Sequence, residues 1–414
     1  MRARETARAL FDAAVAAADP AVAFRRSLKI HPLPQPARET LLLAIGKGAP
    51  AMLREALKHV RGAHRALAAC HHDNTEDVPN VTVLRGAHPV PDAAGLAAAE
   101  KVLSFAGSGT AADHLVVLVS GGASAILPAP LDGISLEDKM VLHKTLLGAG
   151  LDITQMNLVR QQASRIKGGG LLRAAGATPV TGYILSDVVG DDLRVVSSGP
   201  TVTPIGTRDA AVDVLKSAGI WDMQSDAMRA ALSQPSVAVT LPKAENHLIG
   251  SNGQSVAAMA NVAPSDWTVA QANAPLEGDV QDAADEVVAI AKSSNPNTLH
   301  VMGGETTVRL QGAGLGGRNQ ELALRVAAGL EGSHANYVFL SGGTDGRDGP
   351  TDAAGGLVDP GTLARVRAAG HDLRALLANN DSNTALRTAG DLLITGATGT
   401  NVADVQALFI LPEG

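Results

Sequence analysis

One pattern recurs along this chain: an apolar run of strand length stops in glycines mixed with serine, threonine, aspartate, glutamate or lysine. These runs end at residues 45, 119, 185, 249, 302, 340 and 394. Apolar runs of about four to eight residues bounded by turn residues are typical of strands buried on both faces of a parallel sheet. Because ligands bind outside the carboxyl ends of such strands, the pattern predicts an α/β protein with a site at its strand ends.

The chain length predicts more than one domain, because 414 residues exceed what one hydrophobic core usually holds. A fresh series of strands and helices begins at His247, after an ordinary helical stretch over residues 205–240. We therefore expect a Rossmann-like α/β domain over residues 1–240 and a second α/β domain over residues 241–414. We expect each domain to have a mainly parallel sheet flanked by helices. Two such sheets facing each other would place the active site in an interdomain cleft.

Composition excludes several classes of protein. The formal net charge of −7 and the lack of a Lys/Arg cluster disfavour a nucleic-acid partner. No apolar run approaches the roughly 18 residues of a membrane span, and the lone Cys70 excludes an internal disulfide and a CxxC motif. Residues 2–18 carry Glu5 and Asp12 in an amphipathic pattern, which predicts a first helix and not a signal peptide. We expect a cytoplasmic enzyme acting on small molecules; the oligomeric state stays open, a homodimer included.

A glycine-rich stretch before residue 318 contains the dinucleotide-binding fingerprint G-x-G-x-x-G at Gly312, Gly314 and Gly317. The preceding strand carries Arg309 and alternates polar with apolar residues, and Arg318 stands where close strand–helix packing needs a small residue. No acidic residue ends the next strand about twenty residues on, where a ribose would be held. We therefore interpret the stretch as a phosphate loop and not as a nicotinamide site.

The strand-end loops carry groups that suit phosphoryl transfer. Lys47 and Arg318 supply cations, while Asp187, Glu305 and Asp345 supply carboxylates for a divalent metal such as Mg²⁺. Each carboxylate taken alone is more often a helix cap or an Asx turn. Together with glycine loops that expose backbone N–H groups, they predict a phosphotransferase site.

Within this site we assign Lys47, Arg318 and Asp187 as catalytic. The catalytic base stays open among Asp187, Asp345 and Asp352. Residues that could bind substrate or phosphate lie in the same loops or on a basic helix between two of them. They are Ser120, Gly121, Gly122, Ser124, Arg160, Lys167, Gly303, Gly304, Asn319, Gly343 and Thr344.

Many ordered motifs resemble one known family over nearly the whole chain. They include AIGKGAPAM (44–52), HPVPD (88–92), VSGGASA (119–125), MNLVRQQASRIKGGG (156–170), SDVVGDDLRVVSSGPTV (186–202), GGETTV (303–308), GGRNQELAL (316–324), SGGTDGRDGPTDAAG (341–355), NDS (380–382) and TGATGTNVADV (395–405). The chain resembles the class of glycerate 2-kinase whose C-terminal half is the MOFRL domain.

The resemblance implies ATP-dependent phosphorylation of D-glycerate to 2-phosphoglycerate with a divalent metal. It also implies that Lys47 and Arg318, from opposite domains, form the active centre. The chain departs from the family at Gln161-Gln162, Gly170 and Asn383-Thr384, which bears on substrate fit more than on reaction class. Because some relatives carry the label hydroxypyruvate reductase, an NAD(P)H-dependent reductase is the alternative. A sugar-acid binding protein without turnover is a third class.

Overall fold

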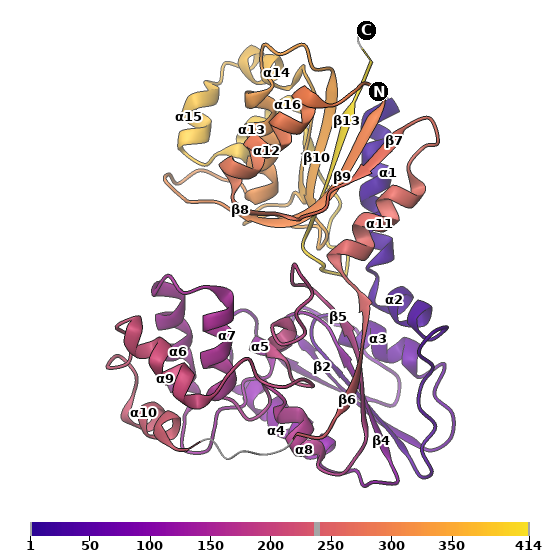
Figure 1. Ribbon diagram of the computed structural model, residues 1–414, viewed down its shortest axis with the longest axis vertical. Coiled ribbons are helices and arrows are strands. Elements are labelled where there is room, and N and C mark those ends of the chain that lie inside the picture. The colour runs from indigo at the N-terminus through magenta and orange to yellow at the C-terminus, as the bar shows by residue number, and fades with distance from the viewer. Residues whose placement is uncertain (1, 236–240, 413–414) are drawn as a thin grey trace. The chain divides into compact units, whose positions relative to one another are not determined.

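The computed structural model describes residues 2–235 and 241–412 (Figure 1). The chain divides into two compact units: residues 20–249 form the N-terminal unit, and the residues up to 19 join those from 250 onward in the C-terminal unit. The domain boundary expected near residue 240 falls on residues 236–240, which lie outside the described residues. The first helix, α1 (Arg2–Ala17), belongs to the C-terminal unit, whereas the sequence placed it in the domain of residues 1–240.

The N-terminal unit contains a six-stranded sheet in the order β3-β2-β1-β4-β5-β6. Its strands are β1 (Thr40–Ile45), β2 (His64–His71), β3 (Thr82–Gly86), β4 (His114–Val119), β5 (Val180–Leu185) and β6 (Ala244–Gly250). The pairings from β3 through β5 are all parallel, which confirms the parallel sheet expected here. The strand order reverses between β1 and β4, so the carboxyl ends of these two strands flank the point where ligands bind in open α/β sheets.

Among the described residues of the N-terminal unit, one apolar cluster packs on the sheet and another lies among helices. Alternate β1 residues such as Leu41 and Leu43 pack with α4, α5 and α8, while α6, α7, α9 and α10 bury a separate helical cluster. The helices are α2 (Pro20–Ser27), α3 (Ala49–Ala56), α4 (Ala93–Ala106), α5 (Ala123–Ile126), α6 (Leu136–Gly148), α7 (Ile153–Gln162), α8 (Gly170–Ala175), α9 (Arg208–Ser217) and α10 (Asp226–Ser233), with a 3-10 turn η1 (Val196–Ser198). Capping boxes at Ser135 and Asp152 fix where α6 and α7 begin.

The C-terminal unit contains a seven-stranded sheet in the order β12-β11-β10-β13-β9-β7, with β8 also paired to β9. Its strands are β7 (Thr268–Gln271), β8 (Leu276–Asp279), β9 (Thr298–Thr307), β10 (Tyr337–Gly343), β11 (Gly355–Val358), β12 (Leu392–Leu393) and β13 (Asp404–Ile410). Only β7 and β8 run parallel to β9, and the other pairings are antiparallel. The α/β class is confirmed, but the mainly parallel sheet expected for this unit is corrected to a mixed one. An apolar run buried on both faces does not reveal its direction.

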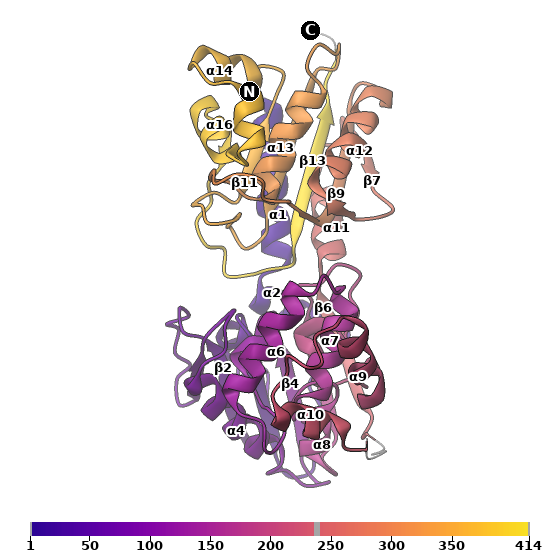
Figure 2. The same cartoon turned by 90° about the vertical axis from the view of Figure 1, so that its left-hand side faces the viewer.

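Helices cover both faces of this second sheet. Helices α1 and α11 (Asn252–Val262) pack on one face against β9, β10 and β13, while α12 and α13 lie on the other (Figure 1). In the view of Figure 2, α13 lies in front of the sheet and α1 behind it. The helices of this second face are α12 (Val280–Ser293), α13 (Arg318–Gly329), α14 (Thr362–Ala368), α15 (Leu373–Ala378) and α16 (Ser382–Ala389). No helix among the described residues is long and apolar enough to cross a membrane.

Candidate active site

The carboxyl ends of β1 and β4 are joined by short backbone contacts. Gly46 follows β1 with φ +110°, and a Cβ atom there would collide with the Ser120 carbonyl, so this position needs glycine. The Lys47 amide donates to the Gly121 carbonyl over 2.9 Å, and the Gly48 amide donates to Ser120 Oγ over 2.9 Å. These contacts fix the exposed Lys47 at the point where the strand order reverses.

Asp187 borders the same loop from the end of β5. A Cβ atom on Gly121 would collide with the Asp187 carboxylate, and one on Gly122 would lie 3.1 Å from Lys47 Cγ. Ser197 Oγ donates to the Ser120 carbonyl over 2.9 Å and adds a further contact to the loop. The structure therefore brings Lys47, Ser120–Gly122 and Asp187 together at one edge of the sheet.

His88 is a residue of this site that the sequence did not single out. It lies beside Gly122, where a Cβ atom would be 3.4 Å from its ring. Burial, together with the charges of Lys47 and His71, lowers the pKa of His88 to about 4. The imidazole is therefore neutral at pH 7 and has one donor and one acceptor nitrogen. The HPVPD motif, which contains His88, carried the signal.

The basic helix expected over Met156 to Lys167 is shorter in the structure: α7 carries Arg160 and ends at Gln162, while Lys167 lies in the turn before α8 and reaches the same region through Ser124. Lys167 Nζ donates to Ser124 Oγ over 2.6 Å, and Ser124 Oγ lies 3.0 Å from Ser198 Oγ. Ser198 in turn donates to Asn157 Oδ1 over 2.9 Å. Arg160 Nη2 donates to His143 Nδ1 over 3.2 Å. Arg160, Lys167 and Ser124, three of the predicted anion-binding residues, thus belong to one neighbourhood of the N-terminal unit.

Two positions where the chain departs from the family pattern have local structural roles. The buried Gln161 donates to the Arg194 carbonyl over 2.8 Å and accepts from the Ile205 amide over 2.8 Å, which holds the segments around η1. A Cβ atom on Gly170 would collide with the Arg165 carbonyl. These departures support the backbone around the basic helix and do not add charge to it.

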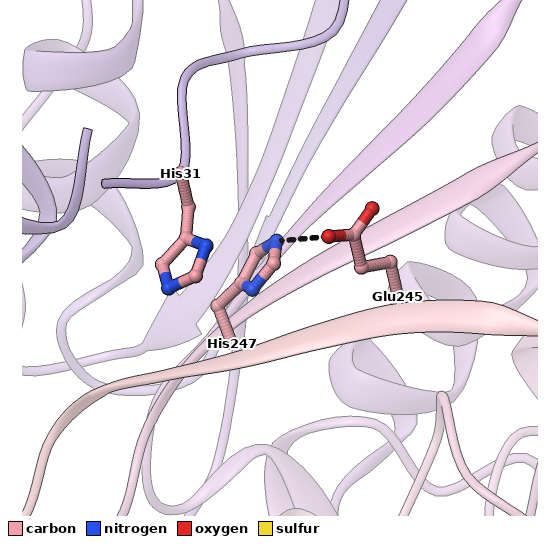
Figure 3. A group of neighbouring side chains, drawn as sticks. All are labelled: His31, Glu245 and His247. Atoms are coloured by element: carbon pink, nitrogen blue, oxygen red, sulfur yellow. Dashed lines mark ion pairs between the residues drawn. The ribbon is translucent and has the colours of Figure 1, made fainter. Parts of the chain in front are cut away.

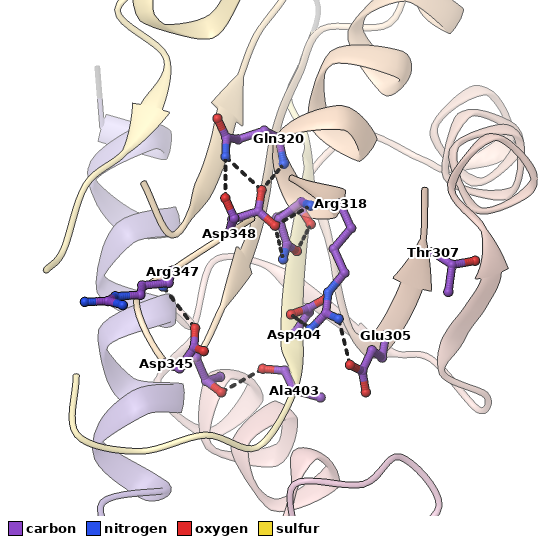
Figure 4. Close-up of polar contacts among 12 residues, drawn as sticks. Glu305, Thr307, Arg318, Gln320, Asp345, Arg347, Asp348, Ala403 and Asp404 are labelled. Atoms are coloured by element: carbon purple, nitrogen blue, oxygen red, sulfur yellow. Dashed lines mark hydrogen bonds and ion pairs between the residues drawn. The ribbon is translucent and has the colours of Figure 1, made fainter. Parts of the chain in front are cut away.

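In the C-terminal unit Arg318 is the first residue of α13 and is held by two carboxylates (Figure 4). Its Nε and Nη2 donate to the two oxygens of Asp404 over 2.6 and 3.0 Å, and its Nη1 donates to Glu305 Oε1 over 2.6 Å. Burial raises the pKa of Asp404 to about 6, and Arg318 opposes this rise, so the carboxylate stays ionised at neutral pH. Both carboxylates raise the pKa of Arg318 above its usual range. Asp404 was missed in the sequence, although it lies in the TGATGTNVADV motif.

The amino end of α13 is occupied by the protein's own Asp348. The Asp348 carboxylate accepts from the amides of Asn319 and Gln320 over 3.1 and 2.8 Å and from Gln320 Nε2 over 3.0 Å (Figure 4). Asp348 is 3% exposed. The anion expected at this helix end is therefore a buried side chain.

The interpretation of residues 312–317 as a phosphate loop is corrected by its contacts. The amides of Gln311, Gly312 and Ala313 donate to the side-chain oxygens of Asn380 and Asn379, and the Gly314 amide donates to the Asn379 carbonyl. Cβ atoms on the loop glycines would collide with residues 379–382 or with Asp348. The glycines permit close packing against the turn before α16, and these N–H groups are used within the protein.

The remaining predicted residues of this unit make local contacts. Cβ atoms on Gly303 and Gly304 would collide with Asn252 and with the Leu276 backbone. Thr344 Oγ1 donates to the Ala403 carbonyl over 2.7 Å, and the buried Asn319 accepts from Ser341 Oγ over 2.6 Å. A Cβ atom on Gly343 would lie 3.3 Å from Asp345 Oδ1 and 3.5 Å from Asp404 Oδ1. A ligand-binding role for these residues stays a prediction.

The carboxylates expected to bind metal come from both units. Asp187 belongs to the N-terminal unit, and Glu305 and Asp345 belong to the C-terminal unit. Carboxylate oxygens suit Mg²⁺, so the donor chemistry fits a magnesium ion. Asp345 Oδ1 accepts from the Arg347 amide over 2.9 Å. Asp352 pairs with Arg387 at the exposed surface, which does not favour it as the base.

One group of three potential metal ligands occurs among the described residues, and it contains none of these carboxylates. It consists of His31, Glu245 and His247, whose ligand atoms lie within 4.8 Å of one another (Figure 3). The two imidazole rings stack with centroids 3.8 Å apart and planes at 16°. Since lone pairs of imidazole nitrogens lie in the ring plane, two nearly parallel rings do not point at one ion. The observed arrangement is one of ring stacking beside Tyr183.

Comparison with known proteins gives matches in both units. Residues 6–233 match the family described as a domain of unknown function, DUF4147, and residues 298–404 match the MOFRL family. A D-glycerate 2-kinase from Thermotoga maritima is 36% identical, over 88% of this chain and 89% of that protein. A solved structure of glycerate kinase from Thermotoga maritima has a TM-score of 0.90 and 33% identity, over 99% of this chain and 100% of that one. A relative from Agrobacterium vitis, 36% identical over 99% of this chain and 94% of its own, carries the provisional name hydroxypyruvate reductase.

Proposed function

The chain belongs to the glycerate 2-kinase family that combines a DUF4147 region with a MOFRL region, and we propose that it transfers the γ-phosphoryl group of ATP to the 2-hydroxyl of D-glycerate. The products are 2-phosphoglycerate and ADP. The observation that carries the proposal is the grouping of Lys47, the Ser120–Gly122 loop and Asp187 at the carboxyl ends of β1, β4 and β5. A cation, backbone amides and a carboxylate are the groups that phosphoryl transfer requires.

The proposed roles follow from charge and position. Lys47 neutralises charge on the transferring phosphoryl group, and the Ser120–Gly122 loop supplies backbone donors. Asp187 orients the attacking hydroxyl or holds the metal. Arg318 of the C-terminal unit supplies a second cation, kept charged by Glu305 and Asp404. A bound Mg²⁺ would neutralise phosphate charge, with Asp187, Glu305 and Asp345 as its candidate carboxylates.

Reduction of hydroxypyruvate with NAD(P)H is the second candidate, and the name of the Agrobacterium vitis relative is the observation that favours it. The dinucleotide fingerprint G-x-G-x-x-G considered in the sequence lies at Gly312–Gly317. Because this stretch packs against residues 379–382 and donates its amides there, it does not support dinucleotide binding. The kinase is therefore the better supported activity.

A direct assay separates the two activities. We expect the purified protein to form ADP from ATP only when D-glycerate and Mg²⁺ are both present. Lys47→Met should abolish this reaction, whereas Lys101→Met, which removes an exposed lysine from α4, should leave it intact. Oxidation of NADH by hydroxypyruvate at a comparable rate, without ADP formation, would replace the kinase with the reductase.

A further inference from the structure

The N-terminal unit contains a buried group of basic side chains, which we call the basic cluster: Lys139, His143, Arg160 and Lys167. The first two lie on α6, Arg160 lies on α7, and Lys167 lies just before α8. Lys139 and Lys167 are only 8% and 5% exposed. The charged groups that act on the cluster are its own members, and none of them forms an ion pair with a carboxylate among the described residues. Buried cations without an opposite charge destabilise a fold, so this arrangement calls for a counter-ion.

The hydrogen bonds of the cluster leave donors available. Lys139 Nζ donates to the Ala163 carbonyl over 3.1 Å, and Lys167 Nζ donates to Ser124 Oγ over 2.6 Å. Among the described residues, the Arg160 side chain makes one hydrogen bond, to His143 Nδ1, and its buried Nε has no partner. An ammonium group carries three donors and a guanidinium group five. Most of these donors could therefore bind an external acceptor.

The position of the cluster connects it with the strand-end loop. Ser124, the acceptor of Lys167, lies just after the Ser120–Gly122 loop and also contacts Ser198. The sequence singled out Arg160 and Lys167, but Lys139 and His143 come from a helix that carried no recognised motif. The structure adds both residues, because α6 and α7 pack in the same apolar cluster.

We propose that the basic cluster is an oxyanion-binding site in which Lys139 and Arg160 contact the anion directly and Lys167 links it to Ser124. The anion is the carboxylate or the phosphate of the glycerate substrate or its phosphorylated product. Only this identity rests on the proposed function; the capacity to bind an oxyanion rests on the unpaired buried cations. Lys139 thus becomes a specificity-determining residue.

The pKa shifts of the cluster predict how anion binding depends on pH. Burial and the neighbouring Arg160 lower the pKa of Lys139 to about 8. Burial, together with the charges of Lys139 and Arg160, lowers the pKa of Lys167 well below its usual range. A bound anion favours the charged form of each group. Binding above pH 8 is therefore expected to take up protons.

The test is calorimetric titration of the full chain with three ligands: inorganic phosphate, D-glycerate and 2-phosphoglycerate. Lys139→Met removes the charge and keeps an unbranched apolar side chain, while Lys144→Met on the exposed side of α6 is the matched control. We expect at least a tenfold loss of affinity in Lys139→Met and less than a twofold change in Lys144→Met. If Lys139→Met weakens the binding of phosphate but not of glycerate, the cluster binds the phosphate group. If it weakens the binding of glycerate but not of phosphate, the cluster binds the carboxylate.

Stability measurements exclude a merely structural role for Lys139. Because Lys139→Met removes an unpaired buried charge, its thermal midpoint without ligand should equal or exceed that of the wild type. Unchanged affinity for all three ligands overturns the proposal, and so does an affinity loss that only accompanies a lowered midpoint. If Lys139→Met does not fold, Arg160→Met carries the same test with the same outcomes.

The kinase proposal and the oxyanion-site proposal can each be refuted without the other. If the wild type forms no ADP but binds anions in a Lys139-dependent way, the kinase proposal falls and the oxyanion site stands. If turnover is normal and both Lys139→Met and Arg160→Met bind all three ligands like the wild type, the oxyanion-site proposal is wrong and the kinase proposal stands.

Discussion

At the scale of single residues, all three nitrogens of the Arg318 guanidinium donate to Asp404 or Glu305. The edge formed by Nε and Nη2 is used entirely by Asp404, which is 1% exposed. A phosphoryl group would therefore meet an arginine that is already oriented and charged. Because the guanidinium is already in place, it does not have to move during the reaction. Arg318 is therefore suited to stabilise the negative charge of the transition state.

The first prediction concerns Arg318→Lys. A lysine keeps the charge but cannot make the two-point contact with Asp404 while also reaching Glu305. We expect kcat to fall by roughly 10²-fold or more, near the cost of removing one preorganised donor. Steady-state kinetics with glycerate and ATP measure this loss. Arg325→Lys is the control, since Arg325 on the same helix pairs with Glu321. A wild-type kcat in Arg318→Lys would defeat the assignment, whatever happens to KM.

The second prediction is a pH dependence of stability that comes from Lys139. Its pKa is lowered to about 8 in the folded protein from the ordinary 10.5. Between these values the unfolded chain binds more protons, so this group makes the protein more stable as pH rises through the window. Lys139→Met lacks this gain. Its advantage over the wild type in free energy of unfolding should therefore be largest below pH 8 and shrink toward pH 10.5.

Denaturant unfolding at several pH values between 7 and 10 measures that difference. Lys144→Met should follow the wild-type curve across the range, because Lys144 is exposed. A constant difference between Lys139→Met and the wild type would show that Lys139 has the same pKa in both states.

At the scale of elements, the start of α13 depends on Asp348, a residue from a distant loop. The third prediction is that Asp348→Asn lowers the free energy of unfolding by about 1–3 kcal/mol, because one amide oxygen replaces the two carboxylate oxygens that accept four buried contacts. Asp352→Asn, four residues along the chain and exposed, should change it by less than about 0.5 kcal/mol. Denaturant unfolding checks both.

The same variant tests the corrected interpretation of this helix. If the amino end of α13 were a phosphate site, removing the resident carboxylate charge of Asp348 would leave room for phosphate and strengthen its binding. We expect no gain in phosphate affinity in Asp348→Asn. A gain of tenfold or more would restore the phosphate-binding interpretation of the glycine-rich stretch.

At the scale of the whole molecule, two helices close together in the sequence belong to different units. Phe11 of α1 lies in the core cluster of Val405 and Phe409, whereas Phe24 of α2 contacts Tyr183 on β5. The fourth prediction is that Phe11→Ala destabilises the C-terminal unit and Phe24→Ala the N-terminal unit, each by about 3–5 kcal/mol. Hydrogen exchange should show lost protection in β10 and β13 for the first variant and in β4 and β5 for the second. Equal loss in all four strands would mean that the units unfold together.

The sequence by itself determined the features that depend on local pattern. Buried strands followed by glycine and polar residues predicted the α/β class, and parallel strands necessarily bring Lys47, the Ser120–Gly122 loop and Asp187 to one edge. The ordered motifs indicated the family, and the comparisons confirm it. These inferences succeed because strand formation and burial are written into neighbouring residues.

Only the tertiary structure decided which distant groups meet. Strand direction in the C-terminal sheet, the place of α1, the carboxylate of Asp348 on α13 and the pairing of Arg318 with Asp404, 86 residues away, all depend on long-range packing. An apolar run can form a parallel or an antiparallel strand, and an arginine can pair with any acidic residue that the fold brings near it. Burial and charge select one arrangement only when the whole chain is folded, because a buried charge or donor destabilises the fold unless a partner lies beside it.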